Sequence, residues 1–160
     1  MSSLHPSNDN AETTTTEFVT VVISDQLFGL PIGRVHDVFM PDSITYVPLA
    51  PPEVAGVLNL RGRIVTAIDM RRRLGLPPIE RTTPPMAVGI DFRGESYGLI
   101  IDAVGEVLRL EDGALETTPA NLDDRWAKVA GGVYRLEGRL MVVLDVDRVL
   151  ASHIPSSIAA

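Results

Sequence analysis

The sequence contains no cysteine, which excludes disulfide bonds, thiol nucleophiles and thiolate metal sites. Aromatic residues make up only 5 % of the 160 residues, and Lys128 is the single lysine beside 13 arginines. The formal net charge of -7 gives no general attraction for phosphate backbones. Small barrels that bind single-stranded nucleic acid use aromatic side chains on a basic face, so we do not expect nucleic acid as a partner.

Long hydrophobic runs are also missing. No segment approaches the ~20 apolar residues that a membrane-spanning helix needs, and the N-terminus lacks the basic start and apolar stretch of a secretory signal. The three histidines, His5, His36 and His153, have no metal-ligand spacing, and no glycine-rich phosphate loop is present. We therefore expect a cytoplasmic protein that does not insert into a membrane and holds neither metal nor cofactor.

What the sequence does contain is a series of short, β-branched apolar runs separated by glycine, proline and aspartate. This pattern predicts an all-β barrel or sandwich. Two short helices are predicted directly after strands. Asp69 is placed to cap a helix over 70–74 that stops at Gly75, and Asp145 is placed to start one over 146–150.

An internal duplication organises these runs. Residues 28–38 match 97–107 at an offset of 69, and residues 56–69 match 132–145 at an offset of 76. The change of offset implies seven extra residues in the second copy, most simply around 115–128. We therefore predict two similar β units of about five short strands each, which pack against each other because each core would be thin.

The predicted organisation has four parts. A polar arm at 1–17 precedes a first barrel at 18–80, and a second barrel at 84–152 is followed by a tail at 153–160. The polar composition of the arm predicts disorder. A proline-rich stretch at 76–85 predicts a stiff, extended connector between the barrels.

The duplication separates structural residues from specific ones at one hairpin turn. Arg61-Gly62 in the first unit corresponds to Glu137-Gly138 in the second. The glycine is common to both because a tight reversal between strands requires a positive φ. The charge differs, so the fold does not demand Arg61, which is free to serve a function of the first unit.

Three segments resemble the CheW family of chemotaxis coupling proteins: FGLPIGRVHDVF, ITYVPLAPPEVAGVLNLRGRIVTAIDMRRRLGL and YGLIIDAVGEVLRL. The spacing of VPLAP, V-x-G-V-x-N-L-R-G-x-I and IDMRRRLG is specific to that family. The resemblance covers Phe18 to about Leu150 and implies two SH3-like five-stranded barrels. It also implies a scaffold without enzymatic activity, which couples the tips of methyl-accepting chemoreceptors to the regulatory domain of the histidine kinase CheA. A barrel module that serves other protein partners is an alternative.

Carried over residue by residue, the partner-facing surface of this family maps onto Ile32, Val35, Asp37, Gly56 and Arg61. Asp37 departs from the family pattern, in which glutamate is commoner, but it keeps the charge. Each position also has a structural interpretation. Ile32 and Val35 alternate as core residues would, Gly56 has a glycine as its repeat partner, and Arg61 can be a solvated hairpin tip. Arginine is nevertheless a favoured interface anchor because it combines bidentate bonding with apolar area.

A serine hydrolase is the alternative from another class. Residues 94–98 match the nucleophile-elbow pattern G-x-S-x-G around Ser96, and Asp102 or Asp145 with His153 follow in the required order. An elbow needs a strand, a turn and a helix, whereas a strand-like run follows Ser96. We therefore interpret these residues as a hairpin.

Two further features have open roles. The run Arg71-Arg72-Arg73 is either a solvated face or a docking surface. Trp126 lies in the extra segment of the second unit and is either a core anchor or a partner contact.

Overall fold

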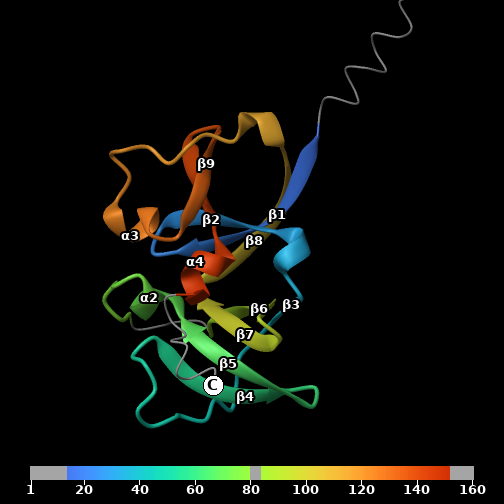
Figure 1. Ribbon diagram of the computed structural model, residues 1–160, viewed down its shortest axis with the longest axis vertical. Helices are drawn as coiled ribbons and strands as arrows, with labels where there is room; N and C mark the ends of the chain where they lie inside the picture. The colour runs from blue at the N-terminus through green and yellow to red at the C-terminus, as the bar shows by residue number, and fades with distance from the viewer. Residues whose placement is uncertain (1–13, 80–83, 152–160) are drawn as a thin grey trace, which may run out of the picture.

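The computed structural model describes residues 14–79 and 84–151 (Figure 1). Within them, ten strands form two five-stranded sheets, ordered β8-β1-β2-β10-β9 (barrel A) and β3-β6-β7-β5-β4 (barrel B). The strands are β1 Thr15–Ile23, β2 Gln26–Pro31, β3 Asp37–Phe39, β4 Val54–Leu60, β5 Arg63–Asp69, β6 Met86–Phe92, β7 Glu95–Ile101, β8 Ala103–Glu111, β9 Ala130–Leu136 and β10 Arg139–Leu144. The predicted all-β class with two SH3-like five-stranded units is confirmed.

Helices are few and short among these residues: α2 Met70–Arg73, α3 Asp124–Ala127, α4 Val146–Ala151, and the 3-10 turns η1 Ile32–Arg34 and η2 Asp112–Ala114. Both predicted helices, α2 and α4, are present. The Asp69 side chain accepts hydrogen bonds from the backbone N–H groups of Arg71 and Arg72, as an N-cap does. No described helix has the length and apolar character that crossing a bilayer requires.

The ends of the predicted organisation fall largely outside the described residues. This holds for most of the arm at 1–17 and for the tail at 153–160. Strand β1 starts at Thr15, three residues before the predicted start of the fold at Phe18. The additional helix α3 lies in the segment around 115–128, where the extra residues of the second copy were placed.

The two barrels do not coincide with the predicted units 18–80 and 84–152. Barrel B takes β3, β4 and β5 from the first unit but its central hairpin, β6–β7, from the second. Barrel A takes β8, β9 and β10 from the second unit and the hairpin β1–β2 from the first. The duplication itself holds, because each strand of one barrel has its counterpart at the same place in the other. Each unit therefore gives its first hairpin to the opposite barrel.

This exchange explains the two parallel pairings in otherwise antiparallel sheets, β2 with β10 and β5 with β7. Each parallel pair joins strands from different units. Neighbouring strands in a chain usually pair with each other, which favoured the simpler division into consecutive units. The local sequence of a hairpin contains no signal for which sheet it will enter.

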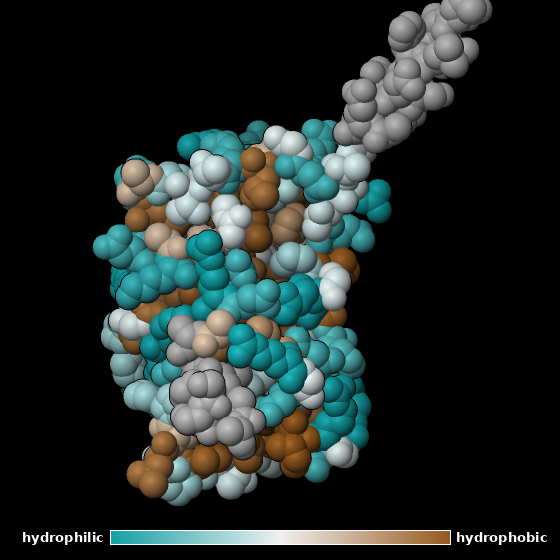
Figure 2. Space-filling view, in the orientation of Figure 1, coloured by the Kyte–Doolittle hydropathy of each residue, from teal (hydrophilic) through white to brown (hydrophobic). Residues whose placement is uncertain are grey.

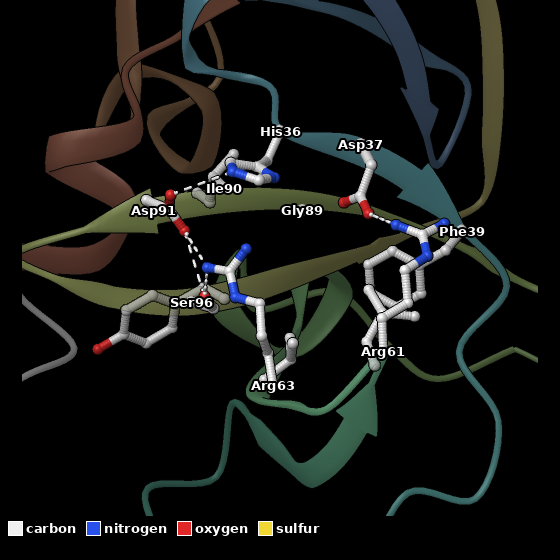
Figure 3. Close-up of a pocket in the computed structure, with 12 residues that line it drawn as sticks. His36, Asp37, Phe39, Arg61, Arg63, Gly89, Ile90, Asp91 and Ser96 are labelled. Atoms are coloured by element: carbon white, nitrogen blue, oxygen red, sulfur yellow. Dashed lines mark hydrogen bonds and ion pairs between the residues drawn. The ribbon is translucent and has the colours of Figure 1, made fainter.

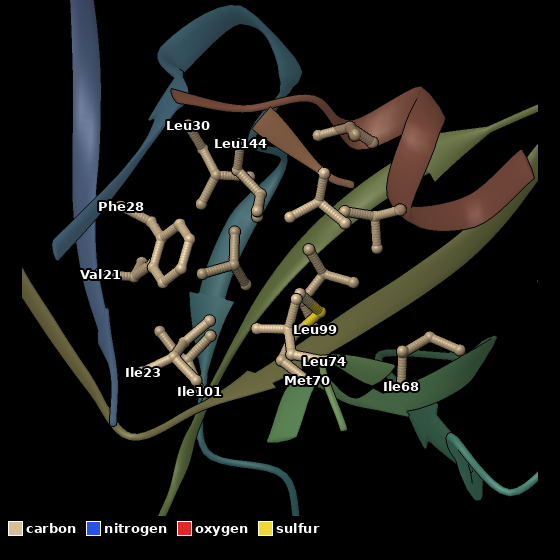
Figure 4. Packing of buried hydrophobic residues seen from close by; sticks show 14 of the residues in the cluster. Val21, Ile23, Phe28, Leu30, Ile68, Met70, Leu74, Leu99, Ile101 and Leu144 are labelled. Carbon is tan, nitrogen blue, oxygen red and sulfur yellow. The ribbon is translucent and has the colours of Figure 1, made fainter. Parts of the chain in front are cut away.

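The exchanged hairpins meet in the main hydrophobic core (Figure 4). Val21, Ile23, Phe28 and Leu30 from β1 and β2 belong to the same buried cluster as Val88, Ile90, Leu99 and Ile101 from β6 and β7. Each barrel also has a smaller cluster of its own, one around Phe39 and the other around Met141. The largest cluster of buried hydrophobic side chains thus lies between the two barrels, and it fixes their relative position.

Candidate partner-binding site

The β4–β5 hairpin of barrel B positions the first functional side chain, that of Arg61. Strands β4 and β5 pair up to Leu60 and Arg63, which leaves Arg61 and Gly62 as the turn. Both turn residues have positive φ, 53° and 84°, as a tight hairpin turn requires. The Asn59 carboxamide oxygen accepts a hydrogen bond from the Gly62 N–H at 2.9 Å. The predicted hairpin turn is confirmed, and it projects Arg61 into solvent.

Arg61 forms an ion pair with Asp37 of β3, with 2.8 Å between the guanidinium NH1 and Oδ2. The arginine side chain is 71 % exposed and the aspartate side chain 22 %. Gly89 of β6 stands opposite Asp37 in the strand register, and a Cβ there would overlap the Asp37 carboxylate. Asp37 is shorter than the glutamate that is commoner at this position, but it lies over Gly89 and still reaches Arg61.

A second polar network lies beside this pair (Figure 3). The Arg63 guanidinium donates to the Asp91 carboxylate at 3.1 Å and to the Ser96 hydroxyl. Ser96 in turn donates to Asp91 at 3.2 Å. The His36 Nε2 lies 3.5 Å from the other Asp91 carboxylate oxygen. Side chains from β5, β6 and β7 and the residue before β3 thus meet at one end of barrel B.

The two networks line one pocket of about 240 Å³. Apolar side chains of barrel B form the rest of its lining: Phe39, Leu60, Val65 and Ile90, with the Tyr97 ring. Burial first, and then the Glu95 charge, raise the pKa of Tyr97, so the phenol stays protonated at neutral pH. An apolar pocket with two arginine–aspartate pairs at its rim is suited to binding a protein side chain with polar neighbours.

The structure brings only some of the predicted site residues together. Asp37 and Arg61 are in contact at the pocket. Ile32 in η1 is 43 % exposed, and Val35 ends that turn, half-buried against the main core. Their surface precedes β3 and does not line the pocket.

Gly56 is also outside the pocket, towards the other end of β4. Its φ is 148°, and a Cβ there would overlap the Thr45 carbonyl oxygen and approach Ile44 Cγ2 to 2.7 Å. Thr45 and Val57 form an isolated bridge at this place. The backbone contact is reason enough for glycine, in agreement with the glycine at the repeat position, Gly132.

Sequence reasoning missed His36, Arg63, Asp91 and Ser96 as pocket residues. Arg63 has an identical counterpart in the second unit, Arg139, so the comparison of the two units does not single it out. Asp91 and Ser96 belong to the hairpin that comes from the other unit. A search for polar side chains on facing strands would have needed the pairing of β5 with β7, which only the fold reveals.

The residues of the hydrolase alternative are not assembled in the described part of the chain. Ser96 lies in β7 of an ordinary hairpin with β6, as interpreted from the sequence. Asp102 pairs with Arg71, and Asp145 precedes α4 and accepts from the Arg148 N–H. His153 lies outside the described residues. No group of three potential metal-ligating side chains occurs among those described.

The three consecutive arginines make separate structural contacts. Arg71 is buried and binds Asp102, Arg72 donates to the Pro52 carbonyl, and Arg73 donates to the carbonyls of Arg148 and Val149 in α4. Figure 1 places α4 where the two barrels meet. Trp126 is 8 % exposed and packs edge-on against Phe28 with 5.4 Å between ring centroids, so it is a core anchor.

Comparison with known proteins gives one consistent family. The chemotaxis protein CheW of Rhizobium meliloti is 31 % identical over 137 residues, which cover 86 % of this chain and 88 % of that protein. The CheW of Thermotoga maritima is 29 % identical over 134 residues, covering 84 % and 87 %. The crystal structure of the scaffolding protein TtCheW from Thermoanaerobacter tengcongensis superposes with a TM-score of 0.73 at 27 % identity, covering 82 % of this chain and 89 % of that one.

The model of the CheW-like domain matches residues 17–153, which span both barrels and every site residue discussed above. The resemblance noted in the sequence, the paired SH3-like barrels and the likeness to a solved scaffolding protein lead to the same assignment. The chain belongs to the CheW-like domain family.

Proposed function

We propose that this chain is a non-enzymatic chemotaxis scaffold that couples cytoplasmic receptor tips to the histidine kinase CheA. Its relatives are chemotaxis proteins, and one with the same fold is described as a scaffolding protein. The role needs surfaces for two partners and a rigid body between them. The shared core between barrels A and B supplies the rigid body.

The observation that carries the proposal is the Arg61–Asp37 pair on an exposed hairpin tip. The fold does not require an arginine there, since the corresponding turn of barrel A has Glu137. An exposed arginine held in one orientation by a carboxylate loses less conformational freedom when a partner binds. We assign this hairpin, with the adjoining pocket, to recognition of receptor or kinase.

Apolar surface near this site supports a protein partner rather than a small molecule. Figure 2 shows hydrophobic surface at the end of the molecule where β4 and β5 lie. Met40, Leu49 and Ile64 of barrel B are exposed apolar side chains. Ile32, with Val35 beside it, extends the candidate surface towards η1, and Gly56 holds the β4 backbone in place. Apolar anchors with a polar rim are the usual composition of protein interfaces.

Two separate faces allow one chain to hold two partners at once. What the scaffold transmits is then a coupling free energy between two binding sites. Individual contacts need not be strong, because an array raises the effective concentration of each partner.

The direct test is reconstitution of purified full chain with kinase and receptor fragments from the same organism. Capture of both partners in one complex, with receptor-dependent kinase activity that requires the chain, is the expected result. Failure to capture either fragment, in the presence of folded protein, would point to a barrel module for other partners. An ester-hydrolysis assay with a Ser96→Ala control tests the enzyme alternative in the same preparation.

A further inference from the structure

Barrel A has a groove at the position that corresponds to the pocket of barrel B. Its volume is about 740 Å³. Its walls are aliphatic and come from β1, β2, β8 and β9: Val22, Leu27, Leu108, Leu110 and Leu136. These side chains belong to the small core cluster of barrel A, and all but Leu27 are only partly buried in it. The groove is therefore open to solvent along an apolar surface.

The internal duplication relates the two cavities residue by residue. At the offsets of 69 and 76, Glu106 takes the place of Asp37, Glu137 that of Arg61 and Arg139 that of Arg63. The second polar network disappears in barrel A, because Leu27 and Val22 stand where barrel B has Ser96 and Asp91. The groove of barrel A is thus more apolar than its twin and carries a different charge.

The charges at its rim distinguish the groove of barrel A most clearly from the pocket of barrel B. In barrel B, the arginine at the hairpin tip neutralises the facing aspartate within the chain. In barrel A both positions carry carboxylates, Glu106 and Glu137, and neither forms an ion pair with another described residue. Two carboxylates at one site favour a cation between them. Among the residues that the structure describes, Arg139 is the single basic side chain that lines the groove, so the carboxylates are in excess there.

Contacts of the main chain fix where these two residues lie on the rim. Thr20 of β1 donates its hydroxyl to the Glu106 carbonyl oxygen at 2.6 Å, next to the register shift between β1 and β8. Glu137 is fixed by the tight β9–β10 turn, in which Gly138 has a φ of 80°. The positions of both residues on the rim therefore follow from the fold.

We propose that this groove binds a partner-protein segment that presents an arginine or lysine beside an aliphatic side chain. The basic group completes the ion pair that barrel A lacks, and the aliphatic side chain packs on the leucines. The methylene stem of the basic residue covers further apolar surface. This inference goes beyond the proposed function, because it concerns the other barrel and assumes nothing about kinase or receptor.

The test uses two capped tripeptides, acetyl-Leu-Arg-Leu-amide and acetyl-Leu-Glu-Leu-amide, added to the full chain and followed by backbone amide NMR shifts. The arginine peptide is expected to shift amides of β8 and of the β9–β10 turn, with binding that weakens as salt rises. The glutamate peptide is expected to leave them unchanged.

Glu137→Arg is the decisive variant. It restores within the chain the ion pair of barrel B, so we expect the affinity for the arginine peptide to fall about fivefold or more while the melting temperature is unchanged or higher. Glu111→Gln removes an exposed carboxylate of the same strand β8 outside the groove and should bind the peptide as the unmodified chain does.

Four results would overturn the inference. They are equal binding of both peptides, shifts confined to the barrel B pocket, no shifts at the highest soluble peptide concentration, and shifts produced by raising the protein concentration alone. The last would assign the groove to a second copy of the chain. None of the four bears on whether the kinase and receptor are captured.

Discussion

Arg71 and Asp102 are joined by a bidentate ion pair where the chain crosses from barrel B to barrel A. The distances are 3.0 Å from Nε to Oδ1 and 2.7 Å from NH2 to Oδ2. The Asp102 carboxylate also accepts from the Ser24 N–H in the β1–β2 turn, at 2.8 Å. One aspartate thus connects helix α2 to the exchanged hairpin. A second pair, Arg34–Asp147 at 3.2 Å, joins η1 to α4. Asp147 corresponds to Arg71 in the repeat, whereas Arg34 follows Gly33, the counterpart of Asp102.

Asp102→Asn is predicted to destabilise the whole molecule. The side chains of Arg71 and Asp102 are only 10 % and 17 % exposed, so the change leaves a largely buried guanidinium without its counter-charge. We expect a loss of about 3 kcal/mol in the free energy of unfolding, measured by urea titration. Glu116→Gln is the matched control, because its pair with Arg135 is exposed, and should cost less than about 1 kcal/mol. Equal losses in the two variants would contradict the connecting role of Asp102.

Gly56→Ala is predicted to act on folding. The added Cβ would overlap the Thr45 backbone at a φ of 148°, so we expect a loss of more than about 2 kcal/mol. Gly62→Ala also has a positive φ but no atom within 4 Å of the new Cβ, and should lose about 1 kcal/mol. Thermal melts of both variants give the comparison. A stable Gly56→Ala protein that fails to bind partners would instead make Gly56 a contact residue.

Arg61→Glu is predicted to weaken partner capture while the protein stays folded. The Arg61–Asp37 pair is mostly exposed, so its loss should change the unfolding free energy by less than about 1 kcal/mol. Loss of an interface arginine should reduce affinity by about tenfold or more. Pull-down and kinase activation measure the effect.

Arg109→Glu is the control for that variant, since it reverses an exposed, ion-paired arginine in barrel A. It should retain capture of the partner that binds barrel B. If Arg61→Glu activates the kinase normally, the hairpin tip is not part of the site.

Asp123 is predicted to give a stability contribution that disappears in acid. Hydrogen bonds from the Arg125 side chain, and then from its backbone N–H, lower the pKa of Asp123 to about 2. Because the folded pKa lies below the ordinary value of 3.8, this contribution is present above pH 3.8 and is lost as the pH falls towards 2.

Asp123→Asn keeps an N-cap acceptor for α3 but removes the charge. Its denaturation midpoint, followed by Trp126 fluorescence, should lie below that of the unmodified chain at pH 7. The two midpoints should converge near pH 2. A difference that is the same at both pH values would exclude the ion pair as its cause.

Local features of the sequence predicted the local structure well. The strand runs, the Asp69 cap and the Arg61-Gly62 turn each depend on residues close together in the chain, and each is present. The repeat offsets compare distant segments, but they need only the identities of the residues and no contact between them. The placement of Asp37 and Arg61 on one surface followed from the family resemblance rather than from their spacing in the sequence, and their ion pair is seen only in the structure.

What the sequence did not reveal depends on contacts between distant strands. The exchange of β1–β2 and β6–β7 leaves hairpin patterns unchanged, so periodicity cannot detect it. The Arg63–Asp91 network follows from that exchange, because Arg63 and Asp91 come from different units. The Arg71 side chain belongs to a basic run that is usually solvated, and its burial depends on Asp102, 31 positions away.

The exchange of hairpins makes the two halves of the gene inseparable as folding units. A fragment ending at residue 79 would keep β3, β4 and β5 but lack the β6–β7 hairpin at the centre of their sheet, and the complementary fragment would lack β1–β2. Neither half can form a complete barrel without the other. The hairpin tips, in contrast, can change independently, and one fold thereby supports two differently charged rims.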